Sequence, residues 1–110
     1  MILTTTNDVP GMRIKEILGL VMGNTIKTRH IGRDIAAVFK NMVGGEIKGY
    51  TEMLTEARNE AIKRMVDEAE KLNADAIVGI RLATSQVMSG AAEMLAYGTA
   101  VKLEKLEGEG

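Results

Sequence analysis

The sequence predicts an α+β fold in which an antiparallel or mixed β-sheet is backed by one short and one long helix, in the order β-β-α-α-β-β. Alternating apolar residues near both ends of the chain predict long strands, and an amphipathic pattern between them predicts a long helix. A chain of 110 residues suits one domain. We place this domain at residues 1–105 and expect residues 106–110 to form a flexible tail.

The N-terminal part is expected to form two strands. Residues 2–6 are mostly β-branched and precede a turn cluster around Pro10 and Gly11. Residues 13–28 alternate as a long strand. Glycine weakens a strand unless a bulge or a close approach needs it, so we expect another surface to pack tightly at Gly19 and Gly23. The alternation predicts two faces: Ile14, Leu18, Leu20, Met22 and Ile26 on one, and Ile17, Gly19, Val21 and Gly23 on the other.

Two helices are expected in the middle of the chain. Asp34 can cap a short helix that carries apolar residues at helical spacing and that Gly44 would end. A second helix is predicted from about Thr51 to Leu72, with an apolar stripe on one face. Its other face carries pairs of opposite charge at i,i+4 spacing, which support an exposed helical surface.

The C-terminal part is predicted to be a hairpin. If Ser89 and Gly90 form its loop, Leu82 lies opposite Tyr97 on a bulky face, and Arg81 lies opposite Gly98 on a face of small residues. We expect the long helix to cover the bulky face. The small face has too few charges for free exposure, so a second layer or a neighbouring subunit is expected to cover it, which predicts a homo-oligomer of closed cyclic symmetry.

Composition excludes several classes of protein. The net charge of -1 gives none of the global attraction typical of proteins that bind nucleic acid or anionic membranes. The chain has no cysteine, which excludes disulfides, thiolate metal sites and thiol nucleophiles. The N-terminus lacks the pattern of a signal peptide, and no stretch is long and apolar enough for a bilayer. We therefore expect a cytoplasmic protein with no nucleic-acid or membrane partner.

Three stretches carry a family resemblance: residues 43–79, the tetrapeptide GRDI at residues 32–35, and YGTAV at residues 97–101. The chain resembles the YbjQ family of prokaryotic proteins, which is described as uncharacterised or as a heavy-metal-binding domain. The resemblance covers nearly the whole chain. It implies a small, dodecin-like α+β subunit that assembles into a ring-like pentamer with a central β-barrel. It implies no established reaction.

The segment GGEIKGYT, residues 44–51, has two interpretations. It lacks the residue order of a phosphate-binding P-loop and follows no predicted strand, which argues against nucleotide binding. The glycines are better explained as the boundary between two helices. Glu46, Lys48 and Tyr50 are then candidates for contact with a neighbouring subunit or with a ligand.

The segment KTRHIGR, residues 27–33, is the densest cluster of basic groups. Lys27, Arg29, His30 and Arg33 precede a predicted helix start, where main-chain N-H groups also favour an anion. The alternative is a solvated loop whose charges pair with Asp34. His30 is the one imidazole in the chain and so the one imidazole candidate for metal binding. No nucleophile is recognisable around it.

Arg81 is a fixed charge within a strand and needs a partner if it is buried. One interpretation is an ion pair across subunits with Glu93 or Glu46, and the other is an anionic ligand held between subunits. Glu93 and Tyr97 are further candidates for interface or ligand contacts. The scattered methionines suit gap filling in the core better than a run of metal ligands.

Three functional hypotheses follow. The first is a homopentameric binding module that holds a small ligand or a metal ion between subunits. The second is a structural oligomer without a ligand. The third is an enzyme, for which the sequence offers no pair of nucleophile and base. The sequence identifies no cofactor.

Overall fold

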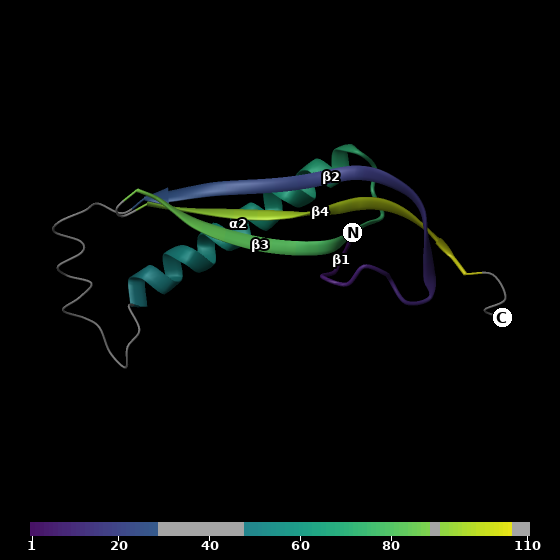
Figure 1. Ribbon diagram of the computed structural model, residues 1–110, viewed down its shortest axis with the longest axis horizontal. Helices are drawn as coiled ribbons and strands as arrows, with labels where there is room; N and C mark the ends of the chain where they lie inside the picture. The colour runs from purple at the N-terminus through teal and green to yellow at the C-terminus, as the bar shows by residue number, and fades with distance from the viewer. Residues whose placement is uncertain (29–47, 89–90, 107–110) are drawn as a thin grey trace.

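The computed structural model describes residues 1–28, 48–88 and 91–106. These residues form four strands and one helix (Figure 1). The elements are β1 (Ile2–Leu3), β2 (Met12–Thr28), α2 (Lys48–Lys71), β3 (Ala76–Met88) and β4 (Ala91–Lys105). The predicted long strands and the long helix are confirmed, and the helix begins at Lys48, before its predicted start.

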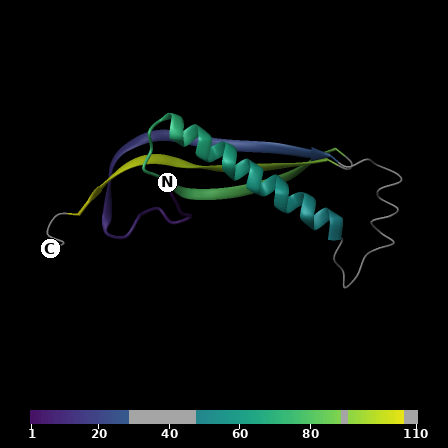
Figure 2. The ribbon, with the colours of Figure 1, turned by 180° about the vertical axis from the view of Figure 1, so that it is seen from behind.

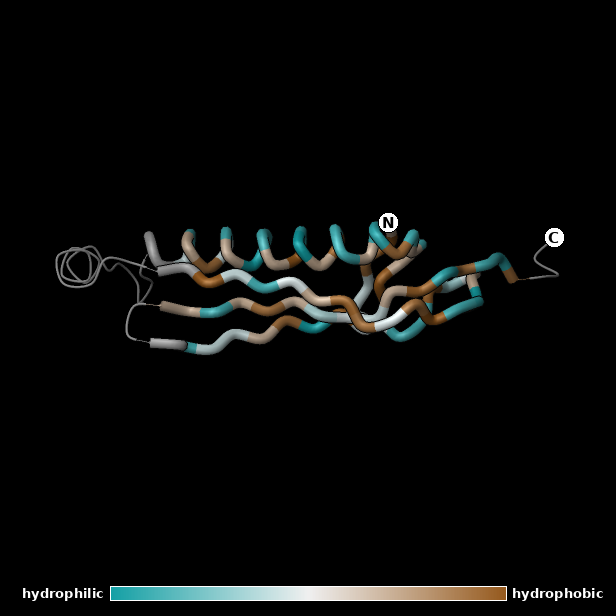
Figure 3. Tube along the Cα trace, turned by 90° about the horizontal axis from the view of Figure 1, so that it is seen from above, coloured by the Kyte–Doolittle hydropathy of each residue, from teal (hydrophilic) through white to brown (hydrophobic). Residues whose placement is uncertain are grey.

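The strands form one sheet in the order β1-β3-β4-β2. β1 is parallel to β3, whereas β4 is antiparallel to both of its neighbours. The helix α2 crosses one face of this sheet diagonally (Figure 2). Seen edge-on, the described residues make two layers, a helix on a sheet (Figure 3). None of the helical residues in the described part of the chain forms a segment that could span a bilayer.

The predicted β-β-α-α-β-β layout, with a dodecin-like ring closed around a central β-barrel, is wrong. The described residues contain one helix, and their sheet is open, with β1 and β2 at its two edges. A barrel requires hydrogen bonds between its first and last strands, and these two strands are not paired. The short helix expected after Asp34 falls in residues 29–47, outside the described residues.

The inner face of the sheet, which is the face under α2, is built for close approach. An added Cβ at Gly23 would lie 2.3 Å from the main-chain oxygen of Ala61 and 2.4 Å from the main-chain nitrogen of Met65. Only glycine therefore allows the helix to come so near, and the tight packing predicted at Gly23 is confirmed. The core between the layers contains Val21, Ala57, Ala61, Met65, Ala69, Ile77, Ile80, Met94, Ala96 and Ala100.

The helix covers the opposite face of the hairpin from the one predicted. Small residues of β4, including Ala96 and Ala100, lie against α2, whereas Tyr97 of the bulky set is exposed. The reason is that the apolar stripe of the helix is itself mostly alanine, so small residues on both layers let the two backbones approach closely. The bulky face is then the one that α2 leaves uncovered.

Two bulges in β3 shift the pairing of the hairpin. Met88 pairs with Ala91, as a two-residue loop requires, but Leu82 pairs with Ala96 and Arg81 pairs with Tyr97. The register shifts lie between Gln86 and Met88 and between Val78 and Arg81. Gly79, in the second of these, has a φ of 62°, a conformation that favours glycine. Each extra residue turns the following side chains to the other face, which explains why the predicted pairs are wrong.

The N-terminal segment covers part of the outer face. After β1, its main chain continues along the edge of β3: Gly79 N donates to Thr6 O at 2.8 Å, and Ile80 N donates to Thr4 O at 3.1 Å. A small second core lies on this side of the sheet. It contains Ala76, Val78 and Val101, with Val9, Ile14 and Leu103 packed around them. Beyond this core, no described residue lies over the outer face, which leaves its central part open.

Candidate functional site

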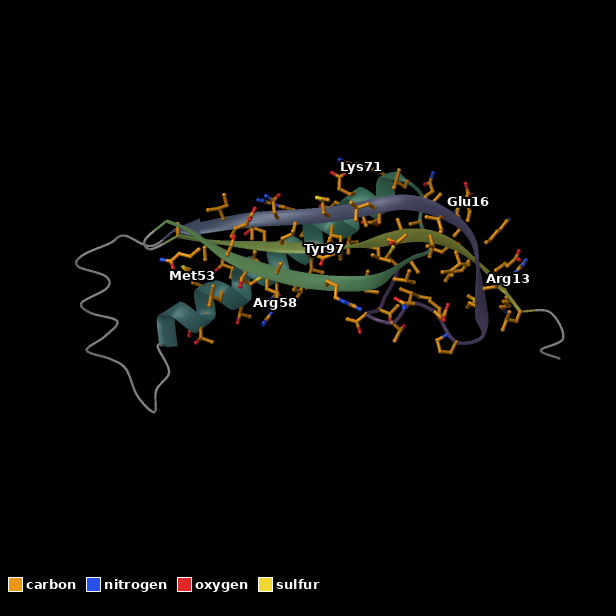
Figure 4. The ribbon with its side chains drawn as sticks, in the orientation of Figure 1. Arg13, Glu16, Met53, Arg58, Lys71 and Tyr97 are labelled. Atoms are coloured by element: carbon orange, nitrogen blue, oxygen red, sulfur yellow. The ribbon has the colours of Figure 1, made fainter. Side chains whose placement is uncertain are left out.

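The outer face of the sheet carries a strip of exposed apolar side chains, which we call the outer strip. Four members come from β2: Ile17 is 69% exposed, Leu20 64%, Met22 48% and Ile26 55%. Tyr97, which pairs with Met22, extends the strip onto β4 and lies over the middle of the sheet (Figure 4). Large apolar groups gathered on one face are typical of an interaction surface.

Bulges in β2 decide which side chains join the outer strip. The pairing with β4 shifts between Ile14 and Glu16 and again between Ile17 and Gly19. As a result Ile17 lies on the outer face, and Leu18 packs against the inner core, which reverses the prediction for both. Gly19 has a φ of 136°, and an added Cβ there would have no atom within 4 Å. Gly19 therefore allows the bulge, and the tight packing predicted at this position is wrong.

Glu93 is held on the outer face by residues of both flanking strands. Asn24 Nδ2 of β2 donates to Glu93 Oε2 at 3.3 Å, and Ser85 Oγ of β3 donates to Glu93 Oε1 at 3.3 Å. The carboxylate is thus oriented across three strands beside the outer strip. Asn24 and Ser85 were not among the predicted site residues, because only the strand register brings them to Glu93.

Arg81 lies opposite Tyr97 on the outer face, not opposite Gly98 as predicted. Its side chain is exposed, and Nη1 donates to Thr5 O at 3.0 Å and to Ile80 O at 2.8 Å. Arg81 therefore holds the N-terminal segment against the sheet. The predicted partner Glu93 binds Asn24 and Ser85 within its own chain, so the ion pair across subunits stays a prediction.

Most of the other predicted site residues lie outside the described residues or in segments of which only the main chain is described. Arg29, His30, Arg33 and Glu46 fall in residues 29–47, outside the described residues. For three more, only the main chain is described: Lys27 pairs with Ala92 near the end of β2, and Lys48 and Tyr50 lie in the first turn of α2.

Metal ligands are not gathered in the described part of the chain. Within residues 1–28, 48–88 and 91–106, no three His, Cys, Asp or Glu side chains lie close enough together to hold a metal ion. Soft metals prefer thiolate, thioether or imidazole ligands. Among the described residues of the outer strip, the soft ligand is the thioether of Met22, and a single thioether does not make a site.

A second polar feature lies at the end of α2. A hollow of about 470 Å³ is lined by Met1, Glu70, Asn73, Ala74, Asp75 and Lys102. Asp75 Oδ2 accepts a hydrogen bond from Leu103 N at 2.8 Å, and its Oδ1 lies 3.8 Å from Lys102 Nζ. Because Asp75 is already used in joining the end of the helix to β4, we assign this hollow a structural role.

Replacing Asp75 with alanine is expected to lower the free energy of unfolding by about 1 kcal/mol, since it removes the hydrogen bond to Leu103. Urea unfolding followed by circular dichroism, at one fixed protein concentration, would measure the change. Lys102→Ala is the control, because it removes only the longer ion pair and should cost a few tenths of a kcal/mol. An equal loss in both variants would contradict the role given to the hydrogen bond.

Comparison with known proteins identifies the family. The model of the YbjQ_1 family, described as "Putative heavy-metal-binding", matches residues 1–104. This chain belongs to that family. A "UPF0145 protein" of Thermotoga maritima is 69% identical over 106 residues, covering 96% of this chain and all of that one. A "UPF0145 protein" of Archaeoglobus fulgidus is 60% identical over 103 residues, covering 94% of this chain and 95% of that one.

A solved structure supports the fold. A protein of unknown function from Pediococcus pentosaceus, assigned to the DUF74 family, matches with a TM-score of 0.61 at 19% identity. The match covers 94% of this chain and 98% of that one. The family match over residues 1–104 confirms the predicted YbjQ resemblance. The description of the family names a class of ligand, heavy metals, but no ligand residues.

Proposed function

We propose that this YbjQ-family protein is a self-associating binding module, in which copies of the chain bury their outer strips and hold a small ligand or a metal ion between them. The observation that supports it is the outer strip itself: several large apolar side chains on one uncovered face. The resemblance implies five copies. The proposal contains no catalytic step.

The physical case rests on the free energy of burial. Burying one large aliphatic side chain contributes about 1.5–3 kcal/mol relative to leaving it in water. Four such side chains on β2 are about half exposed or more. β2 is also an edge strand, and long edge strands with apolar side chains favour association unless something covers them. A second copy would cover the strip and the edge together.

The ligand part of the proposal rests on the groups that association would gather. Glu93 and Arg81 place opposite charges beside the outer strip, and each copy adds another set. Within the described residues, where no three His, Cys, Asp or Glu side chains gather, a soft metal would be held by thioethers of Met22 from several copies. A purely structural oligomer is the alternative, and the internal hydrogen bonds of Glu93 favour it, since they already use this carboxylate.

Replacing Leu20 with aspartate is expected to weaken self-association by about a hundredfold or more, because the change removes apolar contact and buries an unpaired charge. Native mass spectrometry over a dilution series would measure the subunit number. Leu72→Asp is the control, because Leu72 is similarly apolar and 42% exposed, and it lies just beyond the end of α2, away from the outer strip.

Elemental analysis of the same untreated samples would test the ligand part. A metal retained in fixed ratio by the native protein and lost by Leu20→Asp would support a site between copies, and a metal-free oligomer would favour the structural alternative. A wild-type protein that stays monomeric at micromolar concentration would contradict the whole proposal.

A further inference from the structure

We infer that the outer strip of one copy packs against the N-terminal patch of the next, so that copies join head to tail. The N-terminal patch consists of Met1, Ile2 and Leu3, which are 48%, 41% and 44% exposed. The inference rests on the proposed self-association and names the surface that covers the strip. Its starting point is that large apolar side chains are exposed at both edges of the same sheet.

Five equal copies cannot be joined by a surface that packs only against itself. Such a contact uses the same patch on both partners, so it joins copies in pairs. A closed cyclic assembly with an odd number of copies requires each copy to use two different surfaces, one toward each neighbour. The outer strip supplies one of these surfaces, and another part of the chain must supply the second.

The outer strip and the N-terminal patch lie at opposite edges of the sheet. The strand order is β1-β3-β4-β2, so β1, with Ile2 and Leu3, is one edge, and β2, with most of the outer strip, is the other (Figure 1). Two copies placed side by side in the same orientation therefore bring the strip of one toward the patch of the other. Because β1 has only two residues, the contact is one of side chains and not a continuation of the sheet.

The N-terminal patch is held in place by bonds on both sides of it. Ile2 N donates to Asp75 O at 3.2 Å, just after the end of α2. Arg81 Nη1 donates to Thr5 O at 3.0 Å and so fixes the segment that follows the patch. Because this main chain is already ordered, burying the apolar side chains of the patch costs little further conformational entropy.

The charges near the two surfaces are of opposite sign. β2, which carries most of the outer strip, has three basic residues and one acidic residue. The hollow beside Met1 is lined by two acidic residues, Glu70 and Asp75, and by one basic residue, Lys102. Asp8 is the one charged side chain in residues 1–11. A head-to-tail contact thus sets a basic strand against an acidic region, whereas two strips packed together would set one basic strand against another.

Mixing two variants that each lose one surface tests the contact. Leu3→Asp keeps the outer strip and loses the N-terminal patch, whereas Leu20→Asp keeps the patch and loses the strip. Each variant alone should associate about a hundredfold more weakly than the wild type. An equimolar mixture should form dimers with one copy of each variant, because one intact strip then meets one intact patch. These dimers should not grow further, since the two surfaces left over are both altered.

Native mass spectrometry, with one variant labelled with heavy nitrogen, would count the copies of each variant in the complex. Leu106→Asp is the matched control, because this leucine is 40% exposed and belongs to neither surface. It should associate like the wild type. A thermal unfolding curve for each variant shows that it folds, and Ile2→Asp would replace Leu3→Asp if the latter does not.

The outcomes separate this contact from self-association itself. If Leu20→Asp disrupts association but Leu3→Asp associates like the wild type, the inference is overturned and the proposed function stands. If both variants are folded and stay monomeric after mixing, the two surfaces do not meet, and the inference fails as well. A wild type that is monomeric, and that Leu20→Asp destabilises, would mean that residues of the same chain outside the described part cover the strip, which contradicts both proposals.

Discussion

Replacing Gly23 with alanine is expected to lower the free energy of unfolding by about 3 kcal/mol, a large loss for the addition of one methyl group. The new Cβ would lie 2.3 Å from Ala61 O, 2.4 Å from Met65 N and 2.8 Å from the Cβ of Arg64. The first two are main-chain atoms, so the helix must move away from β2 to make room. That movement would also lengthen the hydrogen bond from Arg64 Nη1 to Asn24 O, now 2.6 Å.

Gly19→Ala is the matched control for this prediction, because it makes the same change in the same strand. An added Cβ at Gly19 would meet no atom within 4 Å, and the cost there comes only from its φ of 136°. We expect a loss of about 1–2 kcal/mol. Unfolding of both variants in guanidinium chloride, at one protein concentration, would measure the free energy of unfolding of each. A larger loss for Gly19→Ala than for Gly23→Ala would contradict the close approach of helix and sheet.

The sequence predicts the elements well because their signals are local. Alternation along residues 13–28 and the apolar stripe of the long helix depend only on neighbouring residues. The close packing at Gly23 was also predictable, since an interior glycine in a long strand needs a reason. The two bulges of β2 were not predictable, because an extra residue changes the register without a unique sequence signal. These bulges exchange the faces of Ile17 and Leu18.

The candidate site was harder to predict than the fold because it depends on register. Arg81, Glu93 and Tyr97 were all selected from the sequence, but Arg81 was predicted on the small-residue face, and the bulge of β3 nearest the hairpin loop moves it to the face of Tyr97. Asn24 and Ser85 come from strands far apart in the sequence, and only their pairing through β4 brings both to Glu93. The large side chains exposed on the outer face therefore favour self-association through that face, and not through the small-residue face expected from the sequence.

Variants of two methionines should distinguish effects on the stability of the fold from effects on self-association. Met65 is fully buried between α2 and the sheet, whereas Met22 is 48% exposed in the outer strip. Met65→Ala should lower the free energy of unfolding by about 2–5 kcal/mol, since it leaves a cavity in the core. Met22→Ala should change the stability of the subunit by less than about 1 kcal/mol, because it removes no contact with the core.

The order of the two variants should be reversed for self-association, where Met22→Ala should have the larger effect on the dissociation constant. The folded fraction of Met65→Ala keeps an intact outer face, so its dissociation constant should match that of the wild type. Met22→Ala removes apolar area from the proposed interface and should raise the dissociation constant about tenfold. Sedimentation velocity and chemical unfolding on the same samples would measure both quantities. A Met22→Ala protein with unchanged association would mean that the outer strip is covered by something other than a second copy, because its exposed side chains would then contribute nothing to self-association.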